Sequence, residues 1–141
     1  MLVISVGDLR FEARLEAELA PRTVGLLRRL LPLSSKIIQA RWSGEAAWVP
    51  LGEMNLELPT ENATAYPGAG ELLLYPGGHS ETEILFPYGR THFASTLGTL
   101  AGNHFATVVH GREQLGELGR RVLWDGAQDI SLLEDGTGEP R

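Results

Sequence analysis

Alternation of hydrophobic and polar residues along the chain predicts a protein built mainly of β-strands. An apolar, β-branched run at 2–6 is followed by a Gly-Asp turn signal at 7–8, and apolar and charged residues then alternate over 9–15. Because successive side chains of a strand point to opposite faces, a period of two is typical of a strand with one buried face. Residues 2–15 therefore predict a β-hairpin.

Further short apolar runs, each bounded by Gly, Pro or polar residues, predict more strands. They lie at 34–42, 46–49, 71–75, 83–86, 91–94, 105–109 and 129–133. The segment 87–90, which separates two of these runs, has the composition of a turn. Trp42 and Trp48 are large apolar side chains in the runs 34–42 and 46–49, and we expect both to anchor the core.

Two segments follow the helical period instead. Pro21 suits the first turn of a helix, apolar residues then recur at helical spacing, and Pro32 ends the pattern. Residues 112–123 show a second amphipathic pattern of this kind. About eight short strands and two short helices, separated by Gly and Pro turns, predict a mostly β fold, either a barrel or a closed sandwich.

Chain length and composition favour a single domain. With 141 residues, of which 43% are hydrophobic, the chain is long enough for one sizeable core and short for two. We predict one domain over residues 1–133. Residues 134–141 are mostly polar and contain Gly and Pro, and we expect them to form a flexible C-terminal tail.

Charge and residue usage narrow the classes of function. A net charge of -6 argues against a nucleic-acid partner, because phosphate binding needs a concentrated positive field. The absence of cysteine excludes disulfides and thiolate chemistry. The sequence shows no export signal and no membrane-spanning apolar run, which predicts a cytoplasmic protein without a membrane partner. It also lacks phosphate-binding and dinucleotide motifs, so no cofactor is predicted.

Several short motifs occur in a characteristic order along the chain. They are Trp42-Ser43-Gly44-Glu45, Glu61-Asn62, Pro67-Gly68, the stretch 72–78, the run 80–85, Tyr88-Gly89, Phe93-Ala94-Ser95 and Gly102-Asn103-His104-Phe105. In this order they resemble prokaryotic proteins of unknown function that carry a cyclophilin-like barrel. The resemblance covers nearly the whole chain. It implies a closed cyclophilin-like β-barrel of about eight strands with two short helices, and it leaves the activity open.

The same barrel architecture occurs in peptidyl-prolyl isomerases and in subunits of bacterial amide-ring-opening enzymes. The isomerases use an arginine set among aromatic and amide side chains, and neither Arg41 nor Arg90 lies in that sequence context. The resemblance therefore implies a non-catalytic subunit of a larger amide-hydrolysing complex as one function. An isomerase or peptide-binding module is a second, with less support.

The densest polar cluster lies around residues 79–83. If a strand begins this early, His79, Glu81 and Glu83 point to one face at a spacing of two residues. A histidine and two carboxylates on one face can share a ligand or divide acid and base roles, and a metal site on these three residues is a weaker alternative. The simpler alternative is a strand start at the edge of the barrel whose charges are solvated.

A second polar group follows a glycine-flanked loop at Asn103 and His104. With Tyr88 and Arg90, these residues could line a pocket at the barrel mouth, where Arg90 would hold a carboxylate and His104 would titrate near neutrality. A structural role for His104 remains an alternative. The candidate ligand-binding residues are Glu81, Glu83, Tyr88, Arg90, Asn103 and His104. No catalytic residue is assigned.

Together these residues favour a domain that binds or converts a small polar amide or carboxylate metabolite in a barrel-mouth pocket. A small-molecule ligand is the predicted partner. Whether the protein is an enzyme, and whether it forms a homo-oligomer, is left open by the sequence.

Overall fold

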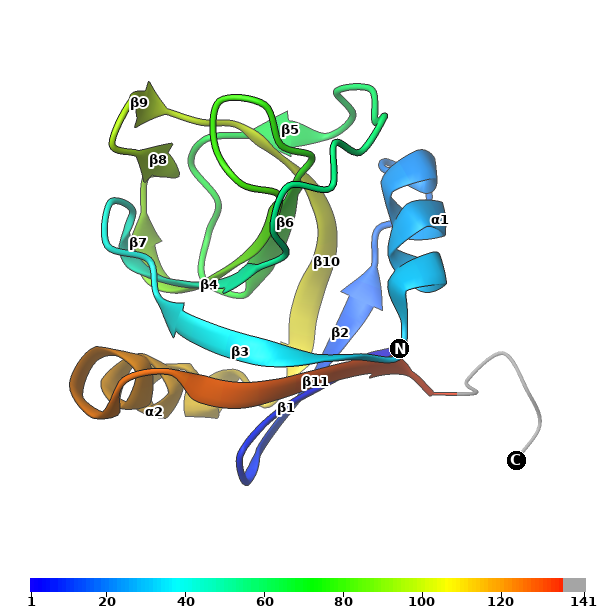
Figure 1. The fold of residues 1–141 in the computed structure, drawn as a ribbon. Coiled ribbons are helices and arrows are strands. Elements are labelled where there is room, and N and C mark those ends of the chain that lie inside the picture. Colours follow the sequence, from blue (N-terminus) through cyan, green and yellow to red (C-terminus); the bar gives the residue numbers. More distant parts are fainter. Residues whose placement is uncertain (136–141) are drawn as a thin grey trace.

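Eight antiparallel strands close into a barrel in the computed structural model, which describes residues 1–135. In spatial order the strands are β2 (Leu9–Leu15), β1 (Leu2–Val6), β11 (Gln128–Glu134), β3 (Leu33–Gln39), β4 (Gly44–Pro50), β7 (Glu83–Thr91), β6 (Glu71–Tyr75) and β10 (Gly102–His110). Pairing of β10 with β2 closes the ring (Figure 1). The predicted mostly β, closed barrel of about eight strands is confirmed.

Shorter elements decorate the barrel. Strand β5 (Ala63–Thr64) pairs with the start of β10, and β8 (Ala94–Ser95) pairs with β9 (Gly98–Thr99) in a separate small hairpin. Helix α1 (Pro21–Leu30) lies beside β10 and β2. Helix α2 (Leu115–Arg120) lies between a 3-10 turn, η1 (Arg112–Gln114), and a π-helical turn, η2 (Arg121–Asp125). None of the helices among residues 1–135 has the length and apolarity needed to cross a bilayer.

The strand period of two divides the buried apolar residues into two clusters. Phe11, Phe86 and Phe105 belong to the larger cluster, which fills the barrel. An eight-stranded barrel is just wide enough for side chains to fill, so its interior is a packed core. A smaller cluster contains Leu73 and Leu85, which alternate with the interior residues of β6 and β7, and Phe93 from the segment that follows β7. The outer face of these strands is therefore partly covered.

The predicted turn at 87–90 is wrong, because β7 continues through it to Thr91. Pro87 lies opposite Ala46, next to an irregularity in the register of β4 between Gly44 and Ala46. A proline in a sheet is tolerated beside such an irregularity because its missing N–H removes no regular ladder bond there. Its carbonyl still accepts a hydrogen bond of 2.8 Å from the N–H of Gly70.

The first residues of the predicted C-terminal tail are part of the barrel. Glu134 ends β11 and accepts two hydrogen bonds, of 2.9 and 3.0 Å, from the guanidinium of Arg28. The N–H of Asp135 donates to the carbonyl of Met1 at 3.2 Å. The rest of that segment, residues 136–141, lies outside the described residues, so the predicted domain boundary stays a prediction.

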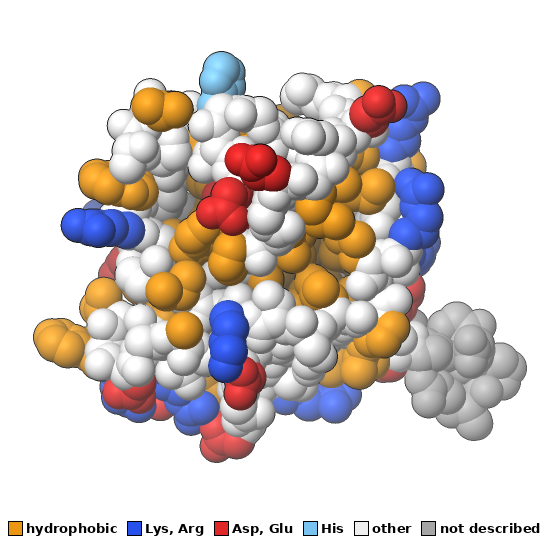
Figure 2. All heavy atoms as spheres, viewed as in Figure 1, with side chains coloured by type: hydrophobic (Ala, Val, Ile, Leu, Met, Phe, Trp, Pro, Cys, Tyr) orange, Lys and Arg blue, Asp and Glu red, His pale blue; other side chains and the backbone are white. Residues whose placement is uncertain are grey.

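Surface charge is mixed on the face shown in Figure 2. Acidic and basic side chains are interspersed there, and hydrophobic side chains are exposed between them. The exposed large hydrophobic residues among 1–135 include Trp42, Leu97, Leu123 and Trp124. Trp42 lines one hollow in the surface, and Leu123 and Trp124 line another.

Candidate functional site

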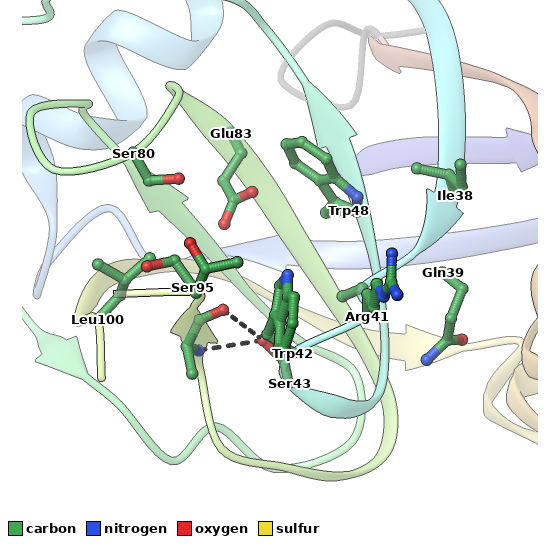
Figure 3. A pocket seen from close by; sticks show the side chains of 13 residues that line it. Ile38, Gln39, Arg41, Trp42, Ser43, Trp48, Ser80, Glu83, Ser95 and Leu100 are labelled. Carbon is green, nitrogen blue, oxygen red and sulfur yellow. Dashed lines mark hydrogen bonds between the residues drawn. The ribbon is translucent and has the colours of Figure 1, made fainter. Parts of the chain in front are cut away.

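A cavity of about 380 Å³ lies against the outer face of β4 and β7. Its volume is within the range of about 300–1,000 Å³ that small-molecule sites occupy. Its walls come from the end of β3, the turn into β4, the start of β7, and β8 (Figure 3). The lining residues are Ile38, Gln39, Ala40, Arg41, Trp42, Ser43, Trp48, Ser80, Glu83, Ala94, Ser95, Thr96 and Leu100.

The turn between β3 and β4 is attached to β8 by a serine. The hydroxyl of Ser43 accepts from the N–H of Ala94 at 3.1 Å and donates to the carbonyl of the same residue at 3.2 Å. The carbonyl of Ser43 accepts from the N–H of His92 at 3.0 Å. These bonds attach the turn to the segment around β8, and they fix the two walls of the pocket relative to each other.

The two tryptophans of this region line the pocket, and the prediction that both anchor the core is wrong for Trp42. Trp42 is at the tip of the β3–β4 turn and remains 53% exposed. Trp48 is half-buried and packs against the smaller apolar cluster. Figure 3 shows both indole rings bordering the pocket, with Arg41 next to Trp42. The Arg41 guanidinium lies 5.4 Å from the centre of the Trp42 ring, in cation–π contact.

Glu83 is the first residue of β7, and its position is fixed by its neighbour Thr82. The backbone of Thr82 exchanges hydrogen bonds with Gly52 and Leu51, each of 2.9 Å. Its buried hydroxyl donates to the carbonyl of Pro76 at 3.1 Å and accepts from the N–H of Met54 at 3.2 Å. A rigid backbone therefore presents the Glu83 side chain to the pocket, where its carboxyl group points inward (Figure 3).

The Glu83 carboxyl is buried without a partner. Only 7% of the residue is exposed, yet within residues 1–135 its side chain makes no hydrogen bond or ion pair. Its oxygens keep contact with the pocket space, since no fully enclosed side-chain nitrogen or oxygen of the described residues lacks a partner. Burial, and to a smaller degree the negative charge of Glu81, raises the pKa of Glu83 to about 8. The carboxyl is therefore mostly protonated at neutral pH.

The pocket is not at the barrel mouth, where the sequence placed it. Ile84 and Phe86 point into the packed interior, so Glu83 and Leu85, which alternate with them, face outward. The cavity is formed because the chain after β7 returns over this outer face through Phe93 and Leu100.

Of the six candidate residues, only Glu83 lines this pocket. Tyr88 borders a different hollow with α2 and η2, and its hydroxyl donates to Gln39 at 2.6 Å. Burial raises the pKa of the Tyr88 hydroxyl. Arg90 is exposed, and its backbone N–H donates to the carboxylate of Glu45 at 2.8 Å.

Asn103 and His104 lie on β10 in hydrogen-bond networks of their own. The amide of Asn103 donates to Thr23 at 3.0 Å and to the carbonyl of Pro59 at 2.9 Å, and its oxygen accepts from the N–H of Glu61 at 3.3 Å. The imidazole Nε2 of His104 is 2.8 Å from the Thr107 hydroxyl. The expected convergence of the candidates on one pocket is therefore wrong, and a ligand role for these residues individually stays a prediction.

The cluster at 79–83 does not share a strand face. Strand β7 begins only at Glu83, so His79 and Glu81 belong to the preceding loop, where both are exposed. Among residues 1–135, no three His, Asp or Glu side chains are arranged to hold a metal ion. The weaker alternative of a metal on His79, Glu81 and Glu83 is therefore not supported by geometry.

Sequence reasoning missed the aromatic and hydroxyl part of the site. Arg41, Trp42, Trp48 and Ser95 were not proposed as ligand-binding residues. A signal was present for Trp42, because it directly precedes the Ser-Gly-Glu turn, and the tip of a turn is a poor place to bury a large side chain.

Comparison with known proteins identifies the family. The model of a family described as "Protein of unknown function (DUF3830)" matches residues 2–134. The chain belongs to this family. The expectation of a family of unknown function is thereby confirmed. The cyclophilin-like fold is compatible with the closed barrel and stays a prediction. No curated protein matches the chain.

Two solved structures share the fold. One is described as "Structure of McbB in complex with tryptophan", with a TM-score of 0.73, 18% sequence identity, and coverage of 100% of this chain and 47% of that chain. This chain thus spans about half the length of that protein. The other, the solution structure of the hypothetical protein AF2241 from Archaeoglobus fulgidus, has a TM-score of 0.60 and 18% identity, covering 94% and 92% of the two chains. At such identities the likeness shows the fold alone.

Proposed function

We propose that this domain binds a small molecule in the pocket lined by Trp42, Trp48 and Glu83. The observation that carries the proposal is the buried carboxyl of Glu83, which faces a cavity of about 380 Å³ without a partner in the described chain. Because the carboxyl oxygens open onto the cavity and no group of the described residues bonds to them, they are available to a ligand that enters it.

The lining favours a ligand with a flat apolar body. Two indole rings and the apolar side chains of Ile38 and Leu100 form most of the walls, and the hydroxyls of Ser80 and Ser95 add polar contacts. The McbB structure, which has the same fold, contains tryptophan, a molecule of this kind. The carboxylate metabolite, one of the two that the sequence favours, fits less well, because an ionised Glu83 would repel it.

One observation favours catalysis as a second candidate function. A carboxyl with a pKa of about 8 can take up and release a proton at neutral pH, which is the property of a general acid or base. A bound substrate placed against Glu83 would meet such a group directly. The amide-hydrolase subunit and the isomerase stay hypotheses that rest on the resemblance alone.

Calorimetric titration with small aromatic probes tests the binding proposal. We choose tryptophan, tryptamine and benzylamine as probes, and we expect at least one of them to bind. In Ser95→Trp a large side chain enters the pocket and should abolish binding. Leu97→Trp, which adds the same side chain to the same hairpin outside the pocket lining, should leave it intact. Failure of every probe to bind, or equal binding to Ser95→Trp, would refute the proposal.

A further inference from the structure

The charge of the ligand follows from what surrounds the Glu83 carboxyl, provided that the pocket is a ligand site as proposed above. We infer that the ligand carries a protonated amine, which pairs with the Glu83 carboxylate while the adjoining apolar body lies against the indole rings of Trp42 and Trp48. The pocket would thereby select cations over neutral and anionic molecules of the same shape.

The geometry offers a cation both of the contacts that it needs. A carboxylate forms a charge-assisted hydrogen bond with an ammonium group, and aromatic faces attract cations through the ring quadrupole. Both elements line one cavity here (Figure 3). Because Glu83 is buried, its charge would be screened by water far less than that of a surface carboxylate.

None of the other charged and titratable groups near Glu83 in the described residues pairs with its carboxyl, so the ligand can supply the counter-ion. Arg41 is the one basic residue in the pocket lining, but it is exposed, stacks on Trp42 and makes no ion pair with Glu83. Glu81, two residues away, is negative and adds attraction for a cation. Tyr75, opposite Glu83 on β6, is engaged with the N–H of His79 at 3.1 Å.

Binding of an amine would be linked to the loss of a proton from Glu83. The free carboxyl is mostly protonated at pH 7, since its pKa is about 8, whereas the ion pair requires the carboxylate. An amine with a pKa near 10 stays charged over this range. Close to one proton should therefore leave the protein for each amine bound, and the affinity should rise about tenfold from pH 6 to pH 7.

The test uses three probes with the same indole body: tryptamine, its alcohol analogue tryptophol, and the corresponding indole carboxylate. Calorimetry in buffers of different ionisation enthalpy gives both the affinity and the protons released. We expect tryptamine to bind at least tenfold more tightly than tryptophol, with the carboxylate weakest, and to release close to one proton at pH 7.

Two variants separate the role of the charge from that of the pocket. Glu83→Gln should lose at least tenfold in tryptamine affinity together with the proton release, and should lose much less affinity for tryptophol, which carries no charge. Glu81→Gln removes a charge from the exposed neighbour outside the lining and should change tryptamine affinity by less than about threefold. Proton release that persists in Glu83→Gln would overturn the assignment.

The possible failures are distinct. Tryptophol or the carboxylate binding as tightly as tryptamine, in a manner blocked by Ser95→Trp, would overturn the cation inference and leave the proposed pocket standing. Absence of binding by all three probes and by the aromatic panel would overturn both.

Discussion

Asn103 and Glu83 are both less than a tenth exposed, but the two polar side chains differ in their hydrogen bonding. Asn103 on β10 uses both of its polar atoms in hydrogen bonds with Thr23, Pro59 and Glu61. Glu83 on β7 has no partner within the described residues and faces a cavity. A satisfied buried amide holds a fold together, whereas a buried carboxyl that opens onto a cavity and has no partner among the described residues is available to a ligand.

The network around Asn103 has an identifiable structural task. Helix α1 has no side-chain cap from its own N-terminal residue. Glu61, from the long segment before β5, accepts hydrogen bonds from the N–H and the hydroxyl of Thr23 at 2.6 and 2.7 Å. A carboxylate is favourable at a helix N-terminus, where N–H groups lack partners. Asn103 connects this cap to the barrel wall.

The largest loss of stability caused by a substitution should come from breaking the hydrogen-bond network around Asn103. Asn103→Ala removes three hydrogen bonds, with the Thr23 hydroxyl, the Pro59 carbonyl and the Glu61 N–H, and we expect it to lower the free energy of unfolding by about 3 kcal/mol. Urea unfolding measures this. The folded variant should bind tryptamine as the wild type does, because Asn103 does not line the pocket. A loss below about 1 kcal/mol would show that the network is not structural.

Ionisation of Glu83 should make the stability of the wild-type protein depend on pH. The pKa of its carboxyl is raised to about 8 by folding, so the folded state holds a proton that the unfolded state releases above its ordinary value of 4.5. Stability from this group is therefore fully present below about pH 4.5 and is lost as the pH rises toward 8, by roughly 1 kcal/mol per pH unit.

Glu83→Gln removes this titration and serves as the matched comparison. The difference in unfolding free energy between the variant and the wild type should grow in favour of the variant from pH 5 to pH 8. Identical pH profiles for the two proteins would contradict a raised pKa. Asp, Glu and His residues elsewhere titrate in both proteins alike, so they do not affect the difference.

The smallest effect on stability should come from Trp42→Ala. Because Trp42 is 53% exposed, truncation should cost only about 1 kcal/mol in unfolding free energy, well below the 3–5 kcal/mol typical of a core aromatic. The same change removes one wall of the pocket and should weaken tryptamine binding about tenfold. A large loss of stability with unchanged binding would assign Trp42 to the core after all.

Local patterns were sufficient to predict most of the barrel but not its outer face. The alternation over residues 9–15 indicates a strand with one buried face, and the leucine run of β6 indicates a strand buried on both faces. Both segments are strands in the structure. The proline at 87 is a local turn signal, whereas its accommodation depends on the register of β4, which the sequence of β7 does not contain.

Of the residues that line the pocket, the sequence predicted only Glu83, and it grouped Glu83 with residues that are not its neighbours in the site. His79 and Glu81 were grouped with it on the assumption of an earlier strand start, but Thr82 and its contacts with Gly52 and Pro76 place that start at Glu83 itself. The actual neighbours, Trp42 and Ser95, come from segments far away in the chain. Their approach depends on the chain after β7 folding back over the barrel wall, a long-range contact that no local pattern encodes.

The protonation state of Glu83 is the most direct test of this account, and carboxyl carbon NMR measures it, with Glu83→Gln used to assign the resonance. In the free protein we predict a titration midpoint near 8, moving to lower pH when tryptamine is bound. A midpoint near the ordinary value of 4.5 in the free protein would contradict the account, because it would show that the carboxyl is not desolvated.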